Sequence, residues 1–312
     1  MNRRLLTSLS LVAFLLTAGC SSIKRTAVNQ VGNALSGGGE VFSSDDDPEL
    51  IRAAAPFSLK LTESLLAETP RHRGLLLTAS SGFTQYAYAF VQEDADEAEA
   101  TDLARAAALR ARARRLYLRA RDYGLRGLEV QHADFRAALA RDPQAAVAGC
   151  DVSDAPLLYW TAASWLAAIS IVKDRPDLIA ELPQAEALLD RAATLDDTYG
   201  HGAIPTLLIA YEMARPGQAK GALDRARRSF DRARTLGGGQ EAGPLVNYAE
   251  AVCLPQQDRE QFEKLLHEAL AINPDNHPPT RLVNLILQRR ARWLLSRLDD
   301  LFLAPAEPSA KP

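Results

Sequence analysis

The chain has 312 residues, and its 36 lysines and arginines stand against 39 aspartates and glutamates, for a formal net charge of −3. That length suits one large domain or two small ones, and the near-neutral charge argues against nucleic acid as a partner, because such proteins carry a basic excess. Aromatic residues make up only 6%, whereas Ala, Leu and Arg, which lose little freedom in a helix, are plentiful, so an all-β fold is excluded.

The first residues have the pattern of a secretory signal peptide. A basic start precedes an apolar stretch over residues 11–16, which is too short to span a bilayer. Small residues then lead to Cys20, as in a bacterial lipobox, where the cysteine is acylated and becomes the mature N-terminus, although Thr17 stands where the lipobox usually has leucine. We predict a signal peptide over residues 1–19 and a lipid at Cys20; the alternative is an ordinary signal peptide with an incidental cysteine.

The residue after Cys20 is serine, as in lipoproteins sorted to an outer membrane, so we expect the chain at the periplasmic face of that membrane. Acyl chains on one residue would anchor it while the rest stays in water. Cys150 and Cys253 are then the remaining thiols. They could form a disulfide bond in an oxidising compartment, or they could be two buried small side chains, the commoner fate of a free cysteine.

Residues 20–46 are rich in Ser, Gly and Asn and are predicted to be a flexible lipidated tether with one short helix near residues 23–35. The tether ends in three aspartates, of which Asp47 precedes Pro48 and Glu49. An aspartate cap, a proline at the first helical position and an acid in the first turn predict the start of a helix. We prefer this to a calcium loop because the ligand spacing of such a loop is missing.

Residues 47–303 form the predicted domain, in which helical stretches alternate with short breakers such as Asp142–Pro143 and the glycines of residues 200–202 and 237–239. No stretch alternates apolar and polar residues with period two. We therefore predict an all-α fold.

Within this domain a small–large–small spacing of four and three residues recurs, as in the second helix of a tetratricopeptide unit. The four occurrences are Ala113–Tyr117–Ala120, Ala185–Leu189–Ala192, Ala226–Phe230–Ala233 and, with its first small residue replaced, Phe262–Leu266–Ala269. We predict a helical-hairpin array with about four degenerate tetratricopeptide-like repeats, closed by a long capping helix over residues 281–303 and followed by a disordered tail, residues 304–312. A generic helical bundle is the alternative.

Signs of enzyme chemistry are weak. The histidines are scattered without metal-ligand spacing, so we expect neither metal nor cofactor. The most enzyme-like cluster combines Asp197, Tyr199 and His201, but it lacks a nucleophile, and we interpret it as a glycine-assisted turn between helices rather than a hydrolase site. We expect no catalytic residue.

A run of arginines between Arg110 and Arg121 follows an acidic stretch, residues 93–102. We interpret the run as a solvated helix whose arginines pair with those acids; an anion site or a contact with acidic partners is the alternative.

Five aromatic residues on expected first helices are candidate ligand-binding residues: Tyr159, Trp160, Trp165, Tyr211 and Tyr248. First helices line the concave side of a tetratricopeptide stack, and aromatic walls suit small organic ligands. The competing interpretation is that they are core residues.

In its order of short segments the chain resembles the T component (TatT) family of TRAP transporters associated with tetratricopeptide proteins. The segments that carry the resemblance are Pro48-Glu49-Leu50-Ile51-Arg52, Leu65-Leu66 to Pro70, Leu75-Leu76-Leu77-Thr78-Ala79-Ser80-Ser81-Gly82-Phe83, Leu158-Tyr159-Trp160-Thr161-Ala162-Ala163-Ser164-Trp165, Tyr199-Gly200-His201-Gly202 and Gln288-Arg289-Arg290-Ala291. The resemblance implies a helical lipoprotein facing the periplasm, a homotrimer with a cavity in each subunit, a small organic ligand, and pairing with a periplasmic substrate-binding component. No catalytic residues come with it.

Three functional hypotheses follow. The first is a lipid-anchored accessory subunit that docks the substrate-binding component of a TRAP transporter and holds or passes its ligand through an internal cavity. The second is an outer-membrane-anchored scaffold that binds peptide or protein partners during envelope assembly. The third, a hydrolase using His201, has the least support.

Overall fold

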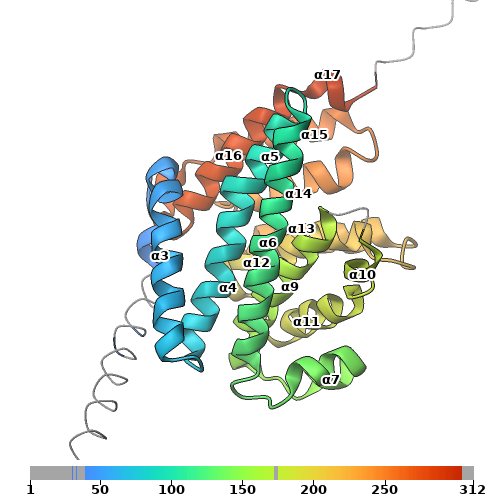
Figure 1. Ribbon diagram of the computed structural model, residues 1–312. Helices are drawn as coiled ribbons and strands as arrows, with labels where there is room; N and C mark the ends of the chain where they lie inside the picture. The colour runs from blue at the N-terminus through green and yellow to red at the C-terminus, as the bar shows by residue number, and fades with distance from the viewer. Residues whose placement is uncertain (1–29, 31–32, 34–38, 172–174, 304–312) are drawn as a thin grey trace, which may run out of the picture.

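The computed structural model describes residues 39–171 and 175–303, together with residues 30 and 33. The expected signal peptide, Cys20, almost all of the helix near residues 23–35, and the tail 304–312 lie outside the described residues. The described residues form helices and no strand (Figure 1), which confirms the all-α class. None of these helices is both long and apolar enough to cross a membrane.

The helices fall into three groups along the chain. The first contains α2 (Gly39–Ser43), α3 (Pro48–Glu68), α4 (Arg73–Ala87), the π-helix η1 (Tyr88–Gln92), α5 (Glu93–Ala98), α6 (Leu103–Leu128), α7 (Phe135–Arg141), α8 (Pro143–Ala148) and the 3₁₀ turn η2 (Val152–Asp154). The second contains α9 (Ala155–Ser170), α10 (Pro176–Ile179), α11 (Leu182–Leu195), α12 (Tyr199–Ala214) and α13 (Ala222–Leu236). The third contains α14 (Ala242–Tyr248), the π-helix η3 (Ala249–Cys253), α15 (Arg259–Ala271), the 3₁₀ turns η4 (Pro274–Asn276) and η5 (Pro278–Thr280), α16 (Arg281–Leu295) and α17 (Leu298–Leu301).

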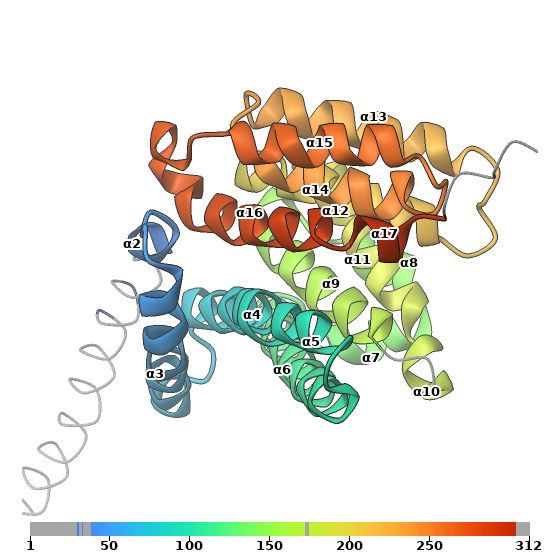
Figure 2. The ribbon, with the colours of Figure 1, turned by 90° about the horizontal axis from the view of Figure 1, so that it is seen from above.

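Seen from above, α3 to α6 form one side of the molecule and α13 to α17 the other, with α9 and α11 between them (Figure 2). The chain thus returns on itself, and α16 lies near α2 and α5 although these helices are far apart in sequence. This arrangement brings α5 into contact with α16.

The predicted start of the first long helix is confirmed. The Asp47 side chain accepts hydrogen bonds from the backbone N–H groups of Glu49 and Leu50, both at 3.0 Å, and Pro48 is the first helical residue. The cap satisfies donors that have no partner within the helix. Within the segment expected to be a tether, α2 occupies residues 39–43.

The four expected helix pairs are packed pairs: α4 with α6, α9 with α11, α12 with α13, and α14 with α15. The small residues of the recurring spacing are at the contacts and fully buried: Ala113, Ala120, Ala185, Ala192, Ala226, Ala233 and Ala269. Small side chains there let the helix axes approach closely. The number of repeats and their kinship to tetratricopeptide units stay predictions.

The predicted break at residues 200–202 is also confirmed. Gly200, His201 and Gly202 have φ values of +59°, +56° and +95°, so regular α12 geometry begins only after them. A Cβ on Gly202 would lie 3.2 Å from the Leu236 Cβ atom. Glycine therefore serves both the left-handed backbone and the close approach of α13.

The prediction of one long helix over residues 281–303 is wrong. Helix α16 ends at Leu295, and the short α17 follows at Leu298–Leu301. The break lets the chain turn back so that Phe302 is buried against Phe262, with ring centroids 5.0 Å apart. Phe262 is the large residue that replaces a small one in the fourth repeat-like helix, and Phe302 covers it.

Candidate functional site

Charged side chains from four helices meet where the two sides of the molecule come together; we call this group the central seam. Its arginines are Arg52 of α3 and Arg289 and Arg290 of α16, and its acids are Glu93, Asp94, Asp96 and Glu97 of α5 and Glu250 of η3. Every acid of the seam lies within 4 Å of at least one of these arginines. The seam therefore fixes α5 against α16.

Arg290 is the most heavily paired residue of the seam. Its guanidinium nitrogens lie 2.7 Å from Glu250, 3.0 Å from Asp96 and 3.5 Å from Glu93, and its side chain is only 12% exposed. Three carboxyl groups thus surround one guanidinium group, and one of them, Asp96, is shared with Arg110. The Arg290 guanidinium stacks on the Trp293 ring, 4.5 Å from the ring centroid, in a cation–π contact.

Two π-helices position the acids of the seam. Glu93 directly follows η1, and Glu250 lies within η3. A π-turn holds one residue more than an α-turn, so the side chains after it are rotated by roughly 100° about the helix axis. Each wider turn thus sets the direction of an acid that faces Arg290. Such π-turns are frequent at functional sites.

Glu93 is the most perturbed acid in the seam. It is only 2% exposed, and this burial raises its pKa to about 7, with Glu250 and Asp96 adding to the rise and Arg290 opposing it. It is hydrogen-bonded to Tyr88, whose own pKa lies well above the usual range because of burial and the neighbouring carboxylates. The seam thus holds a carboxyl that changes charge near neutral pH, a common property of functional sites.

The seam partly corrects the expected pairing of the acidic stretch. Arg110 does pair with that stretch, since it lies 2.7 Å from Glu99 and 3.2 Å from Asp96. Asp94 and Glu97, however, pair with arginines distant in sequence rather than with those of α6. Asp94 and Arg289 are 195 residues apart in the chain, so their salt bridge leaves no local signal in the sequence.

The structure brings two of the five candidate aromatic residues together. Tyr159 and Trp160 are neighbours on α9, with ring centroids 4.9 Å apart. The Trp160 Nε1–H donates to the Tyr199 hydroxyl at 3.0 Å, and the Tyr199 ring lies 5.7 Å from Tyr159. We call these three residues the α9 aromatic group. Tyr199 was expected only in a turn, and no pattern in the sequence indicates that it belongs to this group.

The other three candidates lie apart, in contacts of their own. Trp165 is buried and donates from Nε1 to Glu181 at 2.9 Å. Tyr211 lies under the Arg215 guanidinium, 4.8 Å from the ring centroid. Tyr248 packs on Phe230, in a different apolar cluster from the α9 aromatic group. Their role in ligand binding stays a prediction.

The enzyme-like cluster at residues 197–201 disperses in the fold. Both Asp197 oxygens accept hydrogen bonds from Arg232, at 2.7 and 2.9 Å. Tyr199 belongs to the α9 aromatic group, and the His201 ring lies edge-on to His277 with centroids 5.0 Å apart. Acid, phenol and imidazole thus serve three different contacts, which leaves the hydrolase hypothesis without a converging site.

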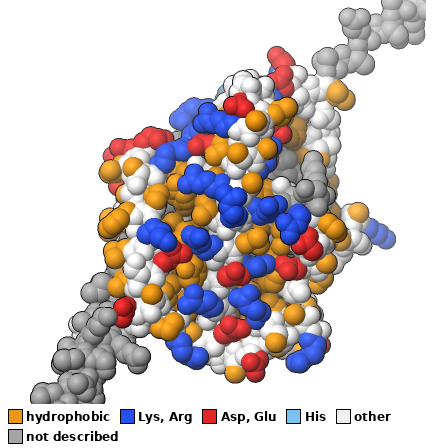
Figure 3. Space-filling view, viewed as in Figure 1, with side chains coloured by type: hydrophobic (Ala, Val, Ile, Leu, Met, Phe, Trp, Pro, Cys, Tyr) orange, Lys and Arg blue, Asp and Glu red, His pale blue; other side chains and the backbone are white. Residues whose placement is uncertain are grey.

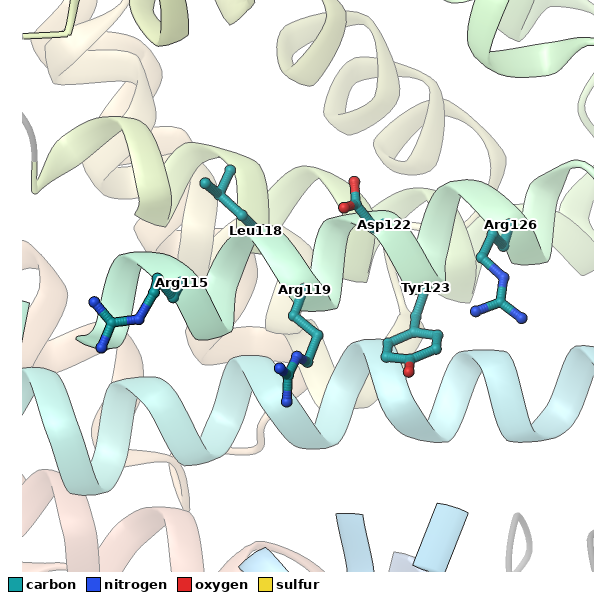
Figure 4. Close-up of a pocket in the computed structure, with 6 residues that line it drawn as sticks. All are labelled: Arg115, Leu118, Arg119, Asp122, Tyr123 and Arg126. Carbon is teal, nitrogen blue, oxygen red and sulfur yellow. The ribbon is translucent and has the colours of Figure 1, made fainter. Parts of the chain in front are cut away.

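The outer side of α6 carries an open hollow of about 400 Å³, lined by Arg115, Leu118, Arg119, Asp122, Tyr123 and Arg126. Arg119 and Tyr123 point toward α4, while Leu118 and Asp122 point the other way (Figure 4). Basic side chains are distributed over the face of the molecule on which α6 lies (Figure 3). The hollow is a surface feature with a basic rim rather than an enclosed cavity.

Comparison with known proteins decides the family. The TRAP transporter T-component family matches residues 44–302 of the chain. This chain belongs to that family. An uncharacterized protein of Treponema pallidum (strain Nichols) is 32% identical in an alignment that covers 93% of this chain and 95% of that protein.

Membership gives this T component an accessory role in TRAP transport and a place at the cell envelope. The match begins three residues before the Asp47 cap and ends at Phe302, so it includes both sides of the central seam. The segment with Arg289 and Arg290, one of those that carried the resemblance, supplies two of the three arginines of the seam.

In the part of the chain that the structure describes, Cys150 and Cys253 are both buried and free, which contradicts the disulfide alternative. Cys253 lies in η3, and Cys150 lies between α8 and η2. One group among the described residues has donor atoms spaced to hold a metal ion, and it consists of His132, Cys150 and Asp154. His132 lies in the turn after α6, and Cys150 and Asp154 lie between α8 and α9. No metal-ligand spacing in the sequence indicates that the three side chains meet.

Proposed function

We propose that this T component is a lipid-anchored subunit at the periplasmic face of the outer membrane. In this role it docks the periplasmic substrate-binding component of a TRAP transporter and holds or passes a small organic ligand. The observation that carries the proposal is the family match over residues 44–302. A transport subunit needs binding surfaces rather than a nucleophile, and we assign no catalytic residue.

The α9 aromatic group and the central seam support the ligand-holding part. Tyr88 packs against both large apolar clusters, and the first of these contains Tyr159, Trp160 and Tyr199. Aromatic faces suit the apolar body of an organic ligand, while tyrosine hydroxyls and the Glu93 carboxyl suit its polar end. The proposed ligand path therefore runs along the contact between the two sides of the molecule.

The lipid anchor is proposed at Cys20 from the lipobox-like sequence. Growth of cells with an alkyne fatty acid, followed by dye coupling, measures acylation of the chain directly. Wild type and a Cys253→Ala variant should be labelled, and a Cys20→Ala variant should not. Labelling that persists in Cys20→Ala would remove the anchor from the proposal.

Helix α3 offers a surface for the proposed homotrimer. Leu50, Phe57 and Leu61 are 56%, 74% and 37% exposed, and their spacing of seven and four places them on one side of the helix. An apolar row of this kind favours contact with another protein surface. Sedimentation should show a Phe57→Glu variant as a smaller species than wild type, whereas Leu103→Glu, at an equally exposed leucine of α6, should sediment as wild type does.

Co-purification tests the docking function. The full-length acylated chain in detergent should retain the co-encoded substrate-binding component in a fixed ratio, and should not retain a binding component from an unrelated transporter. Failure to retain the co-encoded binding component contradicts the proposal. Binding of extended peptides, without a binding component and without a small molecule in native mass spectrometry, would instead favour the envelope-assembly scaffold.

A further inference from the structure

His132, Cys150 and Asp154 come from three short segments that meet beside the ends of α6 and α9. His132 lies in the turn after α6, Cys150 follows α8, and Asp154 ends η2. One nitrogen, one sulfur and one oxygen from these side chains lie within 4.8 Å of one another. We propose that the three side chains bind a zinc ion, independently of the transport function proposed above.

The donor set fits zinc. Imidazole nitrogen, thiolate sulfur and carboxylate oxygen are the ligands that zinc takes in proteins, and three protein ligands leave a fourth position for water or another group. The thiolate and the carboxylate together carry two negative charges toward a divalent ion, and the Arg73 guanidinium beside Asp154 adds one positive charge. Hard cations such as calcium and magnesium prefer oxygen ligands and are disfavoured by the sulfur.

The distances are close to those a tetrahedral ion needs. His132 Nε2 and Asp154 Oδ2 are 2.8 Å apart, and two ligands at zinc-binding distance on a tetrahedral ion are roughly 3.3 Å apart. An opening of a few tenths of an ångström between these two atoms makes room for the ion. The Cys150 sulfur lies within 4.8 Å of them, whereas sulfur and nitrogen ligands of a tetrahedral zinc ion are roughly 3.6 Å apart, so the thiol moves inward as it binds. On binding, the Cys150 thiol releases its proton to water as the sulfur–zinc bond forms, and His132 carries its proton on Nδ1 so that Nε2 can bind.

The ligands are held in place by neighbouring groups. Arg73 donates to Asp154 Oδ1 at 2.5 Å, and the backbone N–H of Asp151 donates to Oδ2 at 3.0 Å. The Cys150 carbonyl accepts a hydrogen bond from Arg191, which fixes the backbone that presents the thiol. Such outer contacts are the usual supports of a zinc site.

Burial gives the site a dry floor and an open side. The Asp154 side chain is 1% exposed and Cys150 2%, whereas the His132 side chain is 25% exposed. An ion can therefore enter past the imidazole without unfolding α6 or α9. The alternative is that the hydrogen bond from His132 to Asp154 is only a structural link between two turns, and the experiment separates the two.

Cobalt substitution tests the proposal, because a thiolate bound to Co²⁺ gives a near-ultraviolet charge-transfer band. Every chain carries Cys20→Ala, so that two thiols remain of the three in the sequence. The two variants compared are Cys150→Ser and Cys253→Ser; Cys253 is the matched control, since it is equally buried and free. We expect one Co²⁺ per chain and the band in Cys253→Ser, and no band in Cys150→Ser.

Zinc should displace the cobalt and raise the thermal midpoint of Cys253→Ser but not that of Cys150→Ser. Loss of the exposed ligand in His132→Ala should weaken zinc binding by about 10-fold or more. Absence of stoichiometric metal, or equal binding by Cys150→Ser, would overturn the proposal. If Cys150→Ser fails to fold by circular dichroism, His132→Ala decides, and its binding zinc as tightly as the parent chain would overturn the proposal as well.

Discussion

The contact between α6 and α9 and the central seam join helices in opposite ways. Between α6 and α9 the surfaces are small and neutral: Gly124 faces Thr161 so closely that an added Cβ would lie 2.0 Å from the hydroxyl oxygen. In the seam, long charged side chains span the space between α5 and α16. The first contact is fixed by shape and the second by charge, so they should fail under different changes.

The largest effect is expected in the seam. Arg290→Met removes the cation shared by Glu93, Asp96 and Glu250. Asp96 keeps Arg110 as a partner, but the buried Glu93 and the partly buried Glu250 lose their arginine, and breaking such a pair costs about 3–5 kcal/mol. Urea unfolding followed by circular dichroism measures the loss. Arg292→Met, at an exposed position of the same helix, should change the free energy of unfolding little. Equal losses in the two variants would show that the seam does not hold the helices together.

The neutral contact should break by crowding. Gly124→Ala places a methyl group against the buried Thr161 and Ser80 hydroxyls, and overpacking of this kind costs about 3 kcal/mol at its upper end, which exceeds the helix preference of alanine. Gly149→Ala is the matched control, because an added Cβ there has no neighbour within 4 Å. A Gly124→Ala protein as stable as Gly149→Ala would contradict the close approach.

A smaller effect is expected from a change in pH, which should alter the stability that the seam contributes but not that of the neutral contact between α6 and α9. The pKa of Glu93 is raised to about 7 in the folded protein by burial, so between its unfolded value near 4.5 and pH 7 the folded state binds the extra proton. The stability that Glu93 contributes is therefore complete below pH 4.5 and is lost as pH rises through 7, by roughly 3 kcal/mol.

Chemical unfolding of Glu93→Gln at pH 5 and pH 8 checks this. Its loss of stability between the two values should be smaller than that of wild type. The exposed Glu260→Gln should behave as wild type does, and Glu241, whose pKa burial also raises to about 7, keeps part of the slope in both. An unchanged slope in Glu93→Gln would contradict the assignment.

The smallest effect is expected in the α9 aromatic group. Trp160→Phe keeps a ring beside Tyr159 but loses the hydrogen bond from Nε1 to the Tyr199 hydroxyl, which is worth about 1 kcal/mol. Thermal unfolding measures the change. The double variant with Tyr199→Phe should lose little more than either single variant, and additive losses would show that the two side chains are not coupled.

The small positions at which paired helices pack could be predicted from the sequence, whereas the α6–α9 contact at Gly124 and the contact fixed by charge could not. Alanines at fixed spacing and the Asp47 cap act over a few residues, so helix class, helix starts and the buried small positions follow from local pattern. The partner of Asp94 could not be found in this way, because nearby arginines of α6 satisfy the same pattern. The end of α16 was not predicted because it depends on the packing of Phe302 against Phe262, which is a tertiary contact.

The candidate site was predicted only in part, for the same reason. Tyr159 and Trp160 were found from their helical positions, whereas Tyr199, the seam and the group of His132, Cys150 and Asp154 depend on which turns meet in space. The π-turns at Tyr88–Gln92 and Ala249–Cys253 leave no recognised sequence signal, yet they aim Glu93 and Glu250 inward.

The return of α16 to the first helices has a consequence for how the chain folds. Arg281 donates to the Ser44 carbonyl, 237 residues away, and closing so long a loop is slow compared with pairing neighbouring helices. We expect adjacent hairpins to form early and the ends to join last. Until α16 arrives, the acids of α5 have Arg52 and Arg110 but lack Arg289 and Arg290, so a nascent or truncated chain would remain open along this line.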